Sequence, residues 1–346
     1  MPSTATERRF RWCASLTVAT IFALIIVGGI VRATGAGMGC PDWPTCFGQW
    51  VPPTHESQLP ANYQQIYADR GYADTEFNVR KTWTEYLNRL LGVFTGFAIL
   101  LTLLFSFPFK RTEPRIFWLS AAGFVLVGVQ GWLGSRVVAS NLMVGMITIH
   151  MLLAQVIVGI VIAALVRSGR DSYKAIRLDS MPPAFYPLML LAMAAGLIQL
   201  VMGTQVREAV DLVARSYDHE NRHLWIDNLP LVFGMHKYYS VLLVALNGWL
   251  AYTVLTHSNS VLLRRLSVTL VVCLLGTIAI GMSMDRLNVP IFSQPVHLLL
   301  ASLIFGTQLA LLLVVQHVRD LKNAGLENDA TTSTVITQST PHPAGR

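Results

Sequence analysis

Residues 296–315, VHLLLASLIFGTQLALLLVV, decide the fold class of this chain. The run contains no Asp, Glu, Lys or Arg, and a helix needs about 20 mostly apolar residues to cross the hydrocarbon core of a bilayer. Further runs of this kind lie upstream at residues 13–31, 88–107, 116–133, 143–166, 185–206, 235–255 and 266–284. The sequence therefore predicts an all-α polytopic membrane protein with eight transmembrane helices.

The composition agrees with a membrane protein. Of the 346 residues, 53% are hydrophobic and only 13% are charged, about half the roughly 25% that is usual for soluble domains. A disordered chain, a disulfide-rich secreted scaffold and a coiled coil are thereby excluded. The net charge of +7 is spread over the loops beside the apolar runs, so it indicates orientation in the bilayer rather than binding of nucleic acid.

Lysine and arginine are unevenly divided between the two sides of the membrane. If the amino terminus is cytoplasmic, most of them fall on that side, and the two short loops on the other side hold only Arg136 and Arg286. The positive-inside rule then places both termini in the cytoplasm and the long loops, 33–84 and 207–234, outside. Residues 1–12 form a cytoplasmic amino terminus, and we expect residues 319–346, poor in apolar side chains, to be a disordered cytoplasmic tail.

An internal repeat divides the chain in two. His150 begins HMLLA in the fourth apolar run, and His297 begins HLLLA in the eighth. His236 begins HKYYS in the sixth run, and Asn88 begins NRLLG at the matching place in the second. The sequence predicts two tandem four-helix bundles, residues 13–177 and 178–318, related as parallel repeats by a pseudo-twofold axis.

Three of these repeat positions hold a histidine inside the membrane, where ionisable side chains are costly and usually functional. A histidine that only bonds a neighbouring carbonyl is the ordinary alternative. His236 and His297 start parallel helices at the same depth, so their imidazoles can face each other across the bundle. Two axial imidazoles suit a haem iron, whereas zinc would require four ligands. We therefore interpret this pair as the ligands of a bis-histidine haem.

The first half differs at one ligand position. His150 has its repeat partner, but Asn88 stands where a second histidine would be, which leaves one side of a bound iron open. Glu85 lies one turn before Asn88, and its repeat counterpart is Phe233. A carboxylate beside an open iron position is what acid–base chemistry needs. The alternative is that Glu85 is an interfacial charge paired with Arg89.

Four arginines close the odd-numbered apolar runs on the outer side: Arg32, Arg136, Arg207 and Arg286. The guanidinium fork matches a carboxylate, so these side chains are candidates to bind haem propionates. Ordinary snorkelling towards the membrane surface explains them equally well.

The outer loop contains a pair of cysteines. Cys40 and Cys46 lie in GCPDWPTCFG. An outer compartment permits a disulfide, so we predict that the two cysteines form one; two reduced thiols are the alternative. The segment His219–His223 reads H-E-x-x-H, as in zinc peptidases. Because it lies in a polar loop and carries an arginine before its second histidine, we do not interpret it as a zinc site.

Several motifs together resemble those of the haem A synthase family. They are GGIVRATGAGMGC at 28–40, CPDWPTCFGQWVPP at 40–53, KTWTEYLNRLLG at 81–92, GTQVREAVD at 203–211 and the histidines that open the fourth, sixth and eighth runs. The resemblance covers about residues 11–318. It implies an oxidoreductase that converts the C8 methyl group of haem O into the formyl group of haem A, which cytochrome oxidase requires, through two hydroxylations and loss of water.

The resemblance also implies roles for single residues. His236 and His297 would bind haem b, His150 would bind the substrate haem O, and Glu85 would be the catalytic carboxylate. Better-known members carry histidine in place of Asn88, so the sixth ligand of the first iron is left open; His55 in the outer loop is a conceivable substitute. These members also suggest a bacterial inner membrane, with membrane lipid, a haem O synthase and an electron acceptor as partners.

Two other functions remain open from the residues. A non-catalytic membrane electron carrier would share the bis-histidine half but would need no Glu85, and a membrane zinc peptidase would use the H-E-x-x-H segment.

Overall fold

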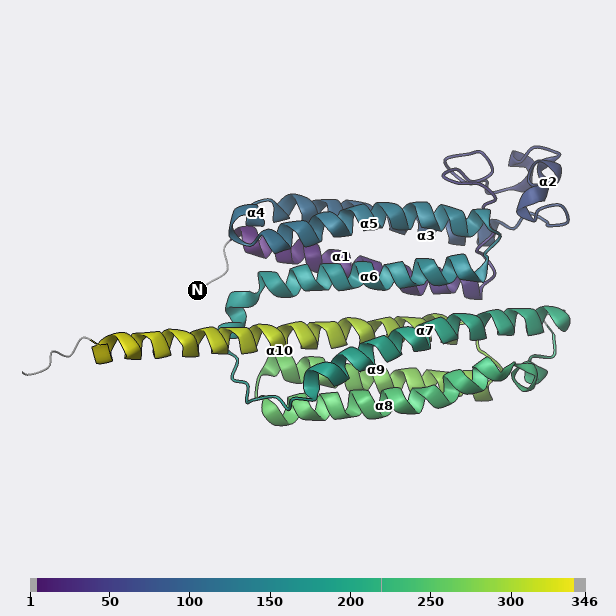
Figure 1. Cartoon of the computed structure of the whole chain (residues 1–346). Helices are drawn as coiled ribbons and strands as arrows, with labels where there is room; N and C mark the ends of the chain where they lie inside the picture. Colours follow the sequence, from purple (N-terminus) through teal and green to yellow (C-terminus); the bar gives the residue numbers. More distant parts are fainter. Residues whose placement is uncertain (1–4, 219, 339–346) are drawn as a thin grey trace, which may run out of the picture.

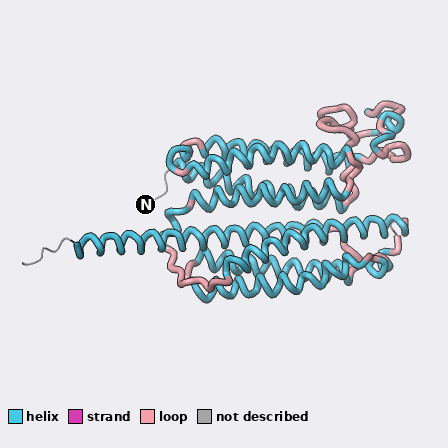
Figure 2. The backbone as a smooth tube through the Cα atoms, in the orientation of Figure 1, coloured by secondary structure: helices cyan, strands magenta, loops and turns pink. Residues whose placement is uncertain are grey.

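The computed structural model describes residues 5–218 and 220–338, with the backbone alone from residue 324 onward. Within these residues the chain is helical and forms no strand, and eight helices are long and apolar enough to cross a membrane. The predicted class, an all-α polytopic membrane protein with eight spans, is confirmed. Figures 1 and 2 show the long helices side by side, with the larger loops gathered at one end.

The eight long helices are α1 (Ala5–Ala33), α3 (Val79–Ser106), α5 (Pro114–Ala139), α6 (Val144–Ser168), α7 (Phe185–Ser216), α8 (Leu231–His257), α9 (Val261–Arg286) and α10 (Ser293–Gln338). The short ones are η1 (Glu56–Gln58), α2 (Tyr63–Ile66), η2 (Ala68–Arg70), α4 (Phe109–Thr112), η3 (Arg170–Ala175), η4 (Arg222–Leu224) and η5 (Ile226–Asn228).

The long helices pack in two groups. Helices α1, α3, α5 and α6 contact one another, as do α7, α8, α9 and α10, and α10 also lies against α1 and α6 (Figure 1). The division between the two groups thus falls between α6 and α7, close to the predicted boundary at residue 177. The repeat relation between the groups stays a prediction.

Buried polar side chains join helices inside the membrane, where few other directional contacts exist. The amide of Gln155 on α6 donates to the hydroxyl of Ser302 on α10 at 2.8 Å. The amide of Gln308 on α10 donates to Asn247 on α8 at 2.7 Å. These bonds fix α10 against both groups.

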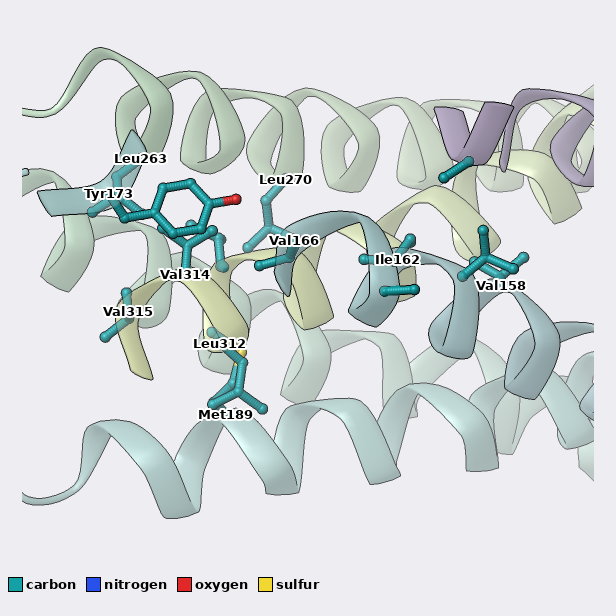
Figure 3. Close-up of a cluster of buried hydrophobic side chains, with 14 of the residues drawn as sticks. Val158, Ile162, Val166, Tyr173, Met189, Leu263, Leu270, Leu312, Val314 and Val315 are labelled. Carbon is teal, nitrogen blue, oxygen red and sulfur yellow. The ribbon is translucent and has the colours of Figure 1, made fainter. Parts of the chain in front are cut away.

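The largest apolar core lies where the two groups meet. Figure 3 shows Val158 and Ile162 of α6 and Leu312 of α10 among its buried side chains, near Met189 of α7. By contrast, Phe97 on α3 is 61% exposed and Val272 on α9 is 61% exposed. Bilayer lipid is as apolar as these side chains, so such helices expose apolar surface that a soluble protein would bury.

A compact outer segment connects α1 to α3. Phe47 is buried at its centre and meets Tyr63, Tyr67, Tyr72 and Phe77 edge-to-face, with ring centroids 5.4–6.2 Å apart. The phenol of Tyr72 donates to the carbonyl of Met38, and burial raises its pKa above the ordinary value. This segment therefore has its own small core.

The carboxyl-terminal segment differs from expectation. A disordered tail is predicted from residue 319, but the backbone of α10 continues helical to Gln338. Extending an existing helix avoids the cost of nucleation, and Leu, Lys, Ala and Glu, which favour helix, recur after residue 320. Residues 339–346 of that predicted tail lie outside the described residues.

Candidate haem-binding site

The side chains of His236 and His297 meet between α8 and α10. Their ring centroids are 6.2 Å apart and the rings are inclined by 52°. Metal–imidazole bonds in proteins are roughly 2 Å long, so an iron shared by two imidazoles also separates their ring centres by roughly 6 Å. Nδ1 of each ring is buried and has no hydrogen-bond partner. The pair fits a bis-histidine haem.

A glycine on the preceding helix faces each of these rings. A Cβ placed on Gly203 of α7 would lie 3.4 Å from Cε1 of His236, and one on Gly281 of α9 would lie 3.4 Å from Cε1 of His297. No longer side chain could occupy either place without moving the ring. The two glycines therefore let each imidazole lie directly against a helix backbone.

In the first group of helices a glycine also faces each of the two matching positions, of which one is a histidine and the other an asparagine. A Cβ on Gly134 of α5 would lie 3.4 Å from Cε1 of His150, and one on Gly28 of α1 would lie 4.0 Å from Oδ1 of Asn88. Nδ1 of His150 and Oδ1 of Asn88 are both buried without a hydrogen-bond partner. One imidazole and one amide thus take the places that two imidazoles take in the second group.

Glu85 is buried on α3, with 3% of its surface exposed. Its carboxylate accepts hydrogen bonds from Nε of Arg89 at 3.2 Å and from the backbone N–H of Cys40 at 2.9 Å. The guanidinium of Arg89 also donates to the carbonyls of Asp42 and Thr45. The pairing of Glu85 with Arg89 is therefore present, and together these two side chains hold the disulfide loop against α3.

The four outer arginines fall into two kinds. Nη2 of Arg32 and Nη2 of Arg207 both bind Asp211, at 3.3 and 2.8 Å, so this carboxylate joins α1 to α7. Arg136 and Arg286 are exposed and have no ion pair among the residues the structure describes. The structure thus gives the first pair an internal carboxylate and leaves the second pair open to one from a ligand.

The remaining predicted residues are placed as follows. Cys40 and Cys46 form a disulfide with an S–S distance of 2.02 Å, so the predicted bond is confirmed. His55 caps η1 in the outer segment and is exposed. His219 lies outside the described residues, and His223 is exposed in η4. In the described part of the chain, no group of three His, Cys, Asp or Glu side chains could hold a metal ion.

Comparison with known proteins shows the family of the chain. The family model COX15-CtaA, described as cytochrome oxidase assembly protein, matches residues 11–309. The chain belongs to the COX15-CtaA family. A relative named heme A synthase from Shewanella oneidensis is 22% identical over 306 residues, covering 81% of this chain and 88% of that protein.

Shorter matches to other bacterial proteins carry the same name. A heme A synthase from Bartonella bacilliformis is 35% identical over 127 residues, 35% of each chain. One from Brucella ovis is 28% identical over 144 residues, 39% of each chain. The relatives are therefore diverse bacterial proteins.

Three kinds of residue in this COX15-CtaA protein were missed by sequence reasoning. The side-chain amides of Gln130 and Gln199 donate to the backbone carbonyls of His150 and His236, at 3.0 and 2.9 Å. The other two are the facing glycines and Asp211. Each outer arginine follows one of these glycines by two to five residues, which was a visible signal, but a single sequence does not tell which neighbouring helix the glycine faces.

Proposed function

We propose that this protein is a haem A synthase, an oxidoreductase that oxidises the C8 methyl group of haem O to the formyl group of haem A for cytochrome oxidase. The observation that carries the proposal is the pair of facing imidazoles in the second group together with a single histidine and an unpartnered amide in the first. Membership of the COX15-CtaA family and the names of its relatives support it.

The two helix groups have different roles: the second binds haem b and the first binds the substrate. His236 and His297 hold haem b, which supplies one-electron transfer when bound. His150 would bind the iron of the substrate haem O, and Asn88, at the position that matches His236, would offer that iron no strong second ligand. Arg136 and Arg286, with Arg32 and Arg207 beside Asp211, are the candidates for the four propionates, because a guanidinium fork pairs with a carboxylate.

The reaction consumes water and releases electrons. Each hydroxylation adds the oxygen of one water to the carbon of the C8 methyl group and removes two electrons and two protons. The second hydroxylation gives a geminal diol, which loses water to leave the formyl group, so the net change removes four electrons and four protons. Glu85 is the group that accepts protons from the attacking water, and an acceptor in the membrane takes the electrons.

The protein works in a bacterial inner membrane with both termini in the cytoplasm, as the distribution of Lys and Arg indicates. The site then lies towards the outer face, at the end that carries the disulfide loop.

Pigment analysis tests the function. Cells that express this chain together with a haem O synthase should accumulate haem A, and cells that express the haem O synthase alone should accumulate haem O. Haem b without any haem A would favour the rival function, a membrane electron carrier.

Replacement of His236 or His297 by alanine should remove the low-spin haem signal from the purified protein, because a single imidazole cannot supply both axial ligands. His257→Ala is the matched control, since His257 lies at the other end of α8. An unchanged low-spin spectrum in both ligand variants would refute the assignment.

Glu85→Gln separates catalysis from support of the loop. Glutamine keeps an oxygen that can accept from Cys40 but loses the charge, so we expect the haem A yield to fall by roughly 10²–10⁴-fold. The haem b spectrum should stay as in the wild type. Hydrogen exchange of the disulfide loop measures how far the lost charge pair with Arg89 loosens the loop, and a loss of yield without faster exchange reports on catalysis alone. Glu113→Gln, which removes a carboxylate paired with Arg167 and Arg170, should have no effect on yield. A normal yield in Glu85→Gln would leave Glu85 only its structural role.

A further inference from the structure

A cavity lies far along the helices from the histidines, at the end where α1 begins. Its volume is about 760 Å³, and its walls come from both helix groups: α1, α6 and η3 on one side, and α9 and α10 on the other. Neither the histidines nor the outer arginines line it. It is therefore separate from the proposed haem sites.

The lining changes from apolar to polar. Leu165 of α6, Leu266 of α9 and Val314 of α10 give an apolar wall. Arg11 of α1 and Arg177, just after η3, add two guanidinium groups. In the part of the chain that the structure describes, neither of these arginines forms an ion pair. A cavity with one apolar and one cationic part matches an amphiphile that carries negative charge.

Tyr173 supplies a buried donor to this cavity. The side chain is 7% exposed, and no described residue accepts a hydrogen bond from its hydroxyl. A Cβ on Gly169 would lie 3.1 Å from that hydroxyl and 3.5 Å from Nη2 of Arg11, so the two donors are close together. Burial raises the pKa of Tyr173, and the charge of Arg11 opposes this only in part, so the phenol keeps its proton at neutral pH.

Helix α9 also begins at the cavity. Val261 and Leu262 occupy its first turn and line the wall, and the first N–H groups of a helix have no partner within the helix. The side chain of Ser260 does not cap them. These N–H groups add a third source of positive potential, which favours an anion.

We propose that this cavity binds one anionic phospholipid from the inner leaflet. The phosphate lies between Arg11 and Arg177 and accepts from the hydroxyl of Tyr173, and an acyl chain lies along the apolar wall. In Figure 3 the ring of Tyr173 lies close to Val166 and Val314, both of which line the cavity. The lipid would fill the space between the two helix groups at the end opposite the haems.

A membrane lipid fits better than a free anion for two reasons. Phosphate alone would leave the apolar wall unfilled. The positive-inside expectation also places this end at the cytoplasmic surface, where anionic headgroups attract Lys and Arg.

Native mass spectrometry of the full chain tests the proposal. Delipidated protein is titrated with dioleoylphosphatidylglycerol, with dioleoylphosphatidylcholine, or with phosphatidylglycerol in the presence of millimolar inorganic phosphate. We expect one retained phosphatidylglycerol, at least tenfold preference over phosphatidylcholine, and no displacement by phosphate. Equal retention of the two lipids, or displacement by phosphate alone, would overturn the proposal.

Variants locate the site. Arg11→Gln and Arg177→Gln should each weaken retention of phosphatidylglycerol roughly fivefold, since an arginine near an anionic surface contributes about that factor. Arg115→Gln removes the same charge from the start of α5, outside the cavity, and should leave retention unchanged. Ala310→Phe fills the apolar wall without altering charge and should also reduce retention. Circular dichroism verifies the fold of each variant, and wild-type retention in both arginine variants would refute the site.

Discussion

At the scale of single residues, the position of each candidate haem ligand depends on the glycine that faces its ring. Each of the three histidines has a glycine within 3.4 Å of its Cε1, measured from an ideal Cβ on that glycine. A distance of this size is ordinary contact for one methyl group, but it leaves no room for a branched side chain. The glycines therefore leave the space that the imidazole rings occupy.

Gly203→Leu should displace His236 and abolish the low-spin haem signal, whereas Gly203→Ala should keep most of it. Gly196→Leu is the matched control, because Gly196 lies on the same helix and its Cβ would meet no atom within 4 Å. Absorption spectra of the purified variants measure the outcome. A full low-spin signal in Gly203→Leu would show that the ring does not need this space.

At the scale of elements, the outer segment between α1 and α3 is held by three kinds of contact. The disulfide joins Cys40 to Cys46, and the ring of Phe47 contacts four aromatic side chains. Arg89 on α3 donates to the carbonyls of Asp42 and Thr45. Because Glu85 accepts from Cys40, the order of this segment and the position of the proposed catalytic carboxylate are linked.

Phe47→Ala should loosen this segment. Truncating a buried phenylalanine costs about 3–5 kcal/mol, so hydrogen exchange of residues 40–78 should accelerate by roughly a hundredfold or more while the long helices stay protected. Phe97→Ala removes an exposed ring from α3 and should change exchange little. Wild-type exchange in Phe47→Ala would mean that the disulfide and Arg89 suffice to hold the segment.

At the scale of the whole molecule, a small number of polar contacts join the two helix groups. The amide of Gln155 reaches Ser302 in the middle of the interface, and Asp211 binds arginines from both groups near the outer end. The side chain of Asp211 is 29% exposed, so solvent screens this cluster only in part. Removing it leaves two guanidinium groups facing each other.

Asp211→Asn should therefore lower the free energy of unfolding by about 1–3 kcal/mol and the melting temperature by several degrees. Asp285→Asn breaks the pair with Lys237, whose side chain is 53% exposed, and should have a much smaller effect, since a pair with an exposed partner contributes little and no second guanidinium is left facing the first. Thermal unfolding of both variants in the same detergent measures the difference. Equal melting temperatures would show that Asp211 does not hold the groups together.

The sequence by itself determined the eight helices and their approximate limits, and it indicated the disulfide. Apolar runs such as 296–315 are long enough to span a bilayer whatever they pack against, and Cys40 and Cys46 are separated by only a short, proline-containing turn. It also singled out Glu85 and the three histidines, because ionisable groups stand out in an apolar run.

Only the tertiary structure decided which side chains meet. The 6.2 Å approach of His236 and His297 and the sharing of Asp211 join helices far apart in the sequence, and the glycines opposite the rings depend on how consecutive helices are turned toward each other. Helices that are apolar on nearly every side carry little signal of which face is turned inward. The rotation and register of each helix therefore follow from packing and a few polar contacts, which a single sequence does not display.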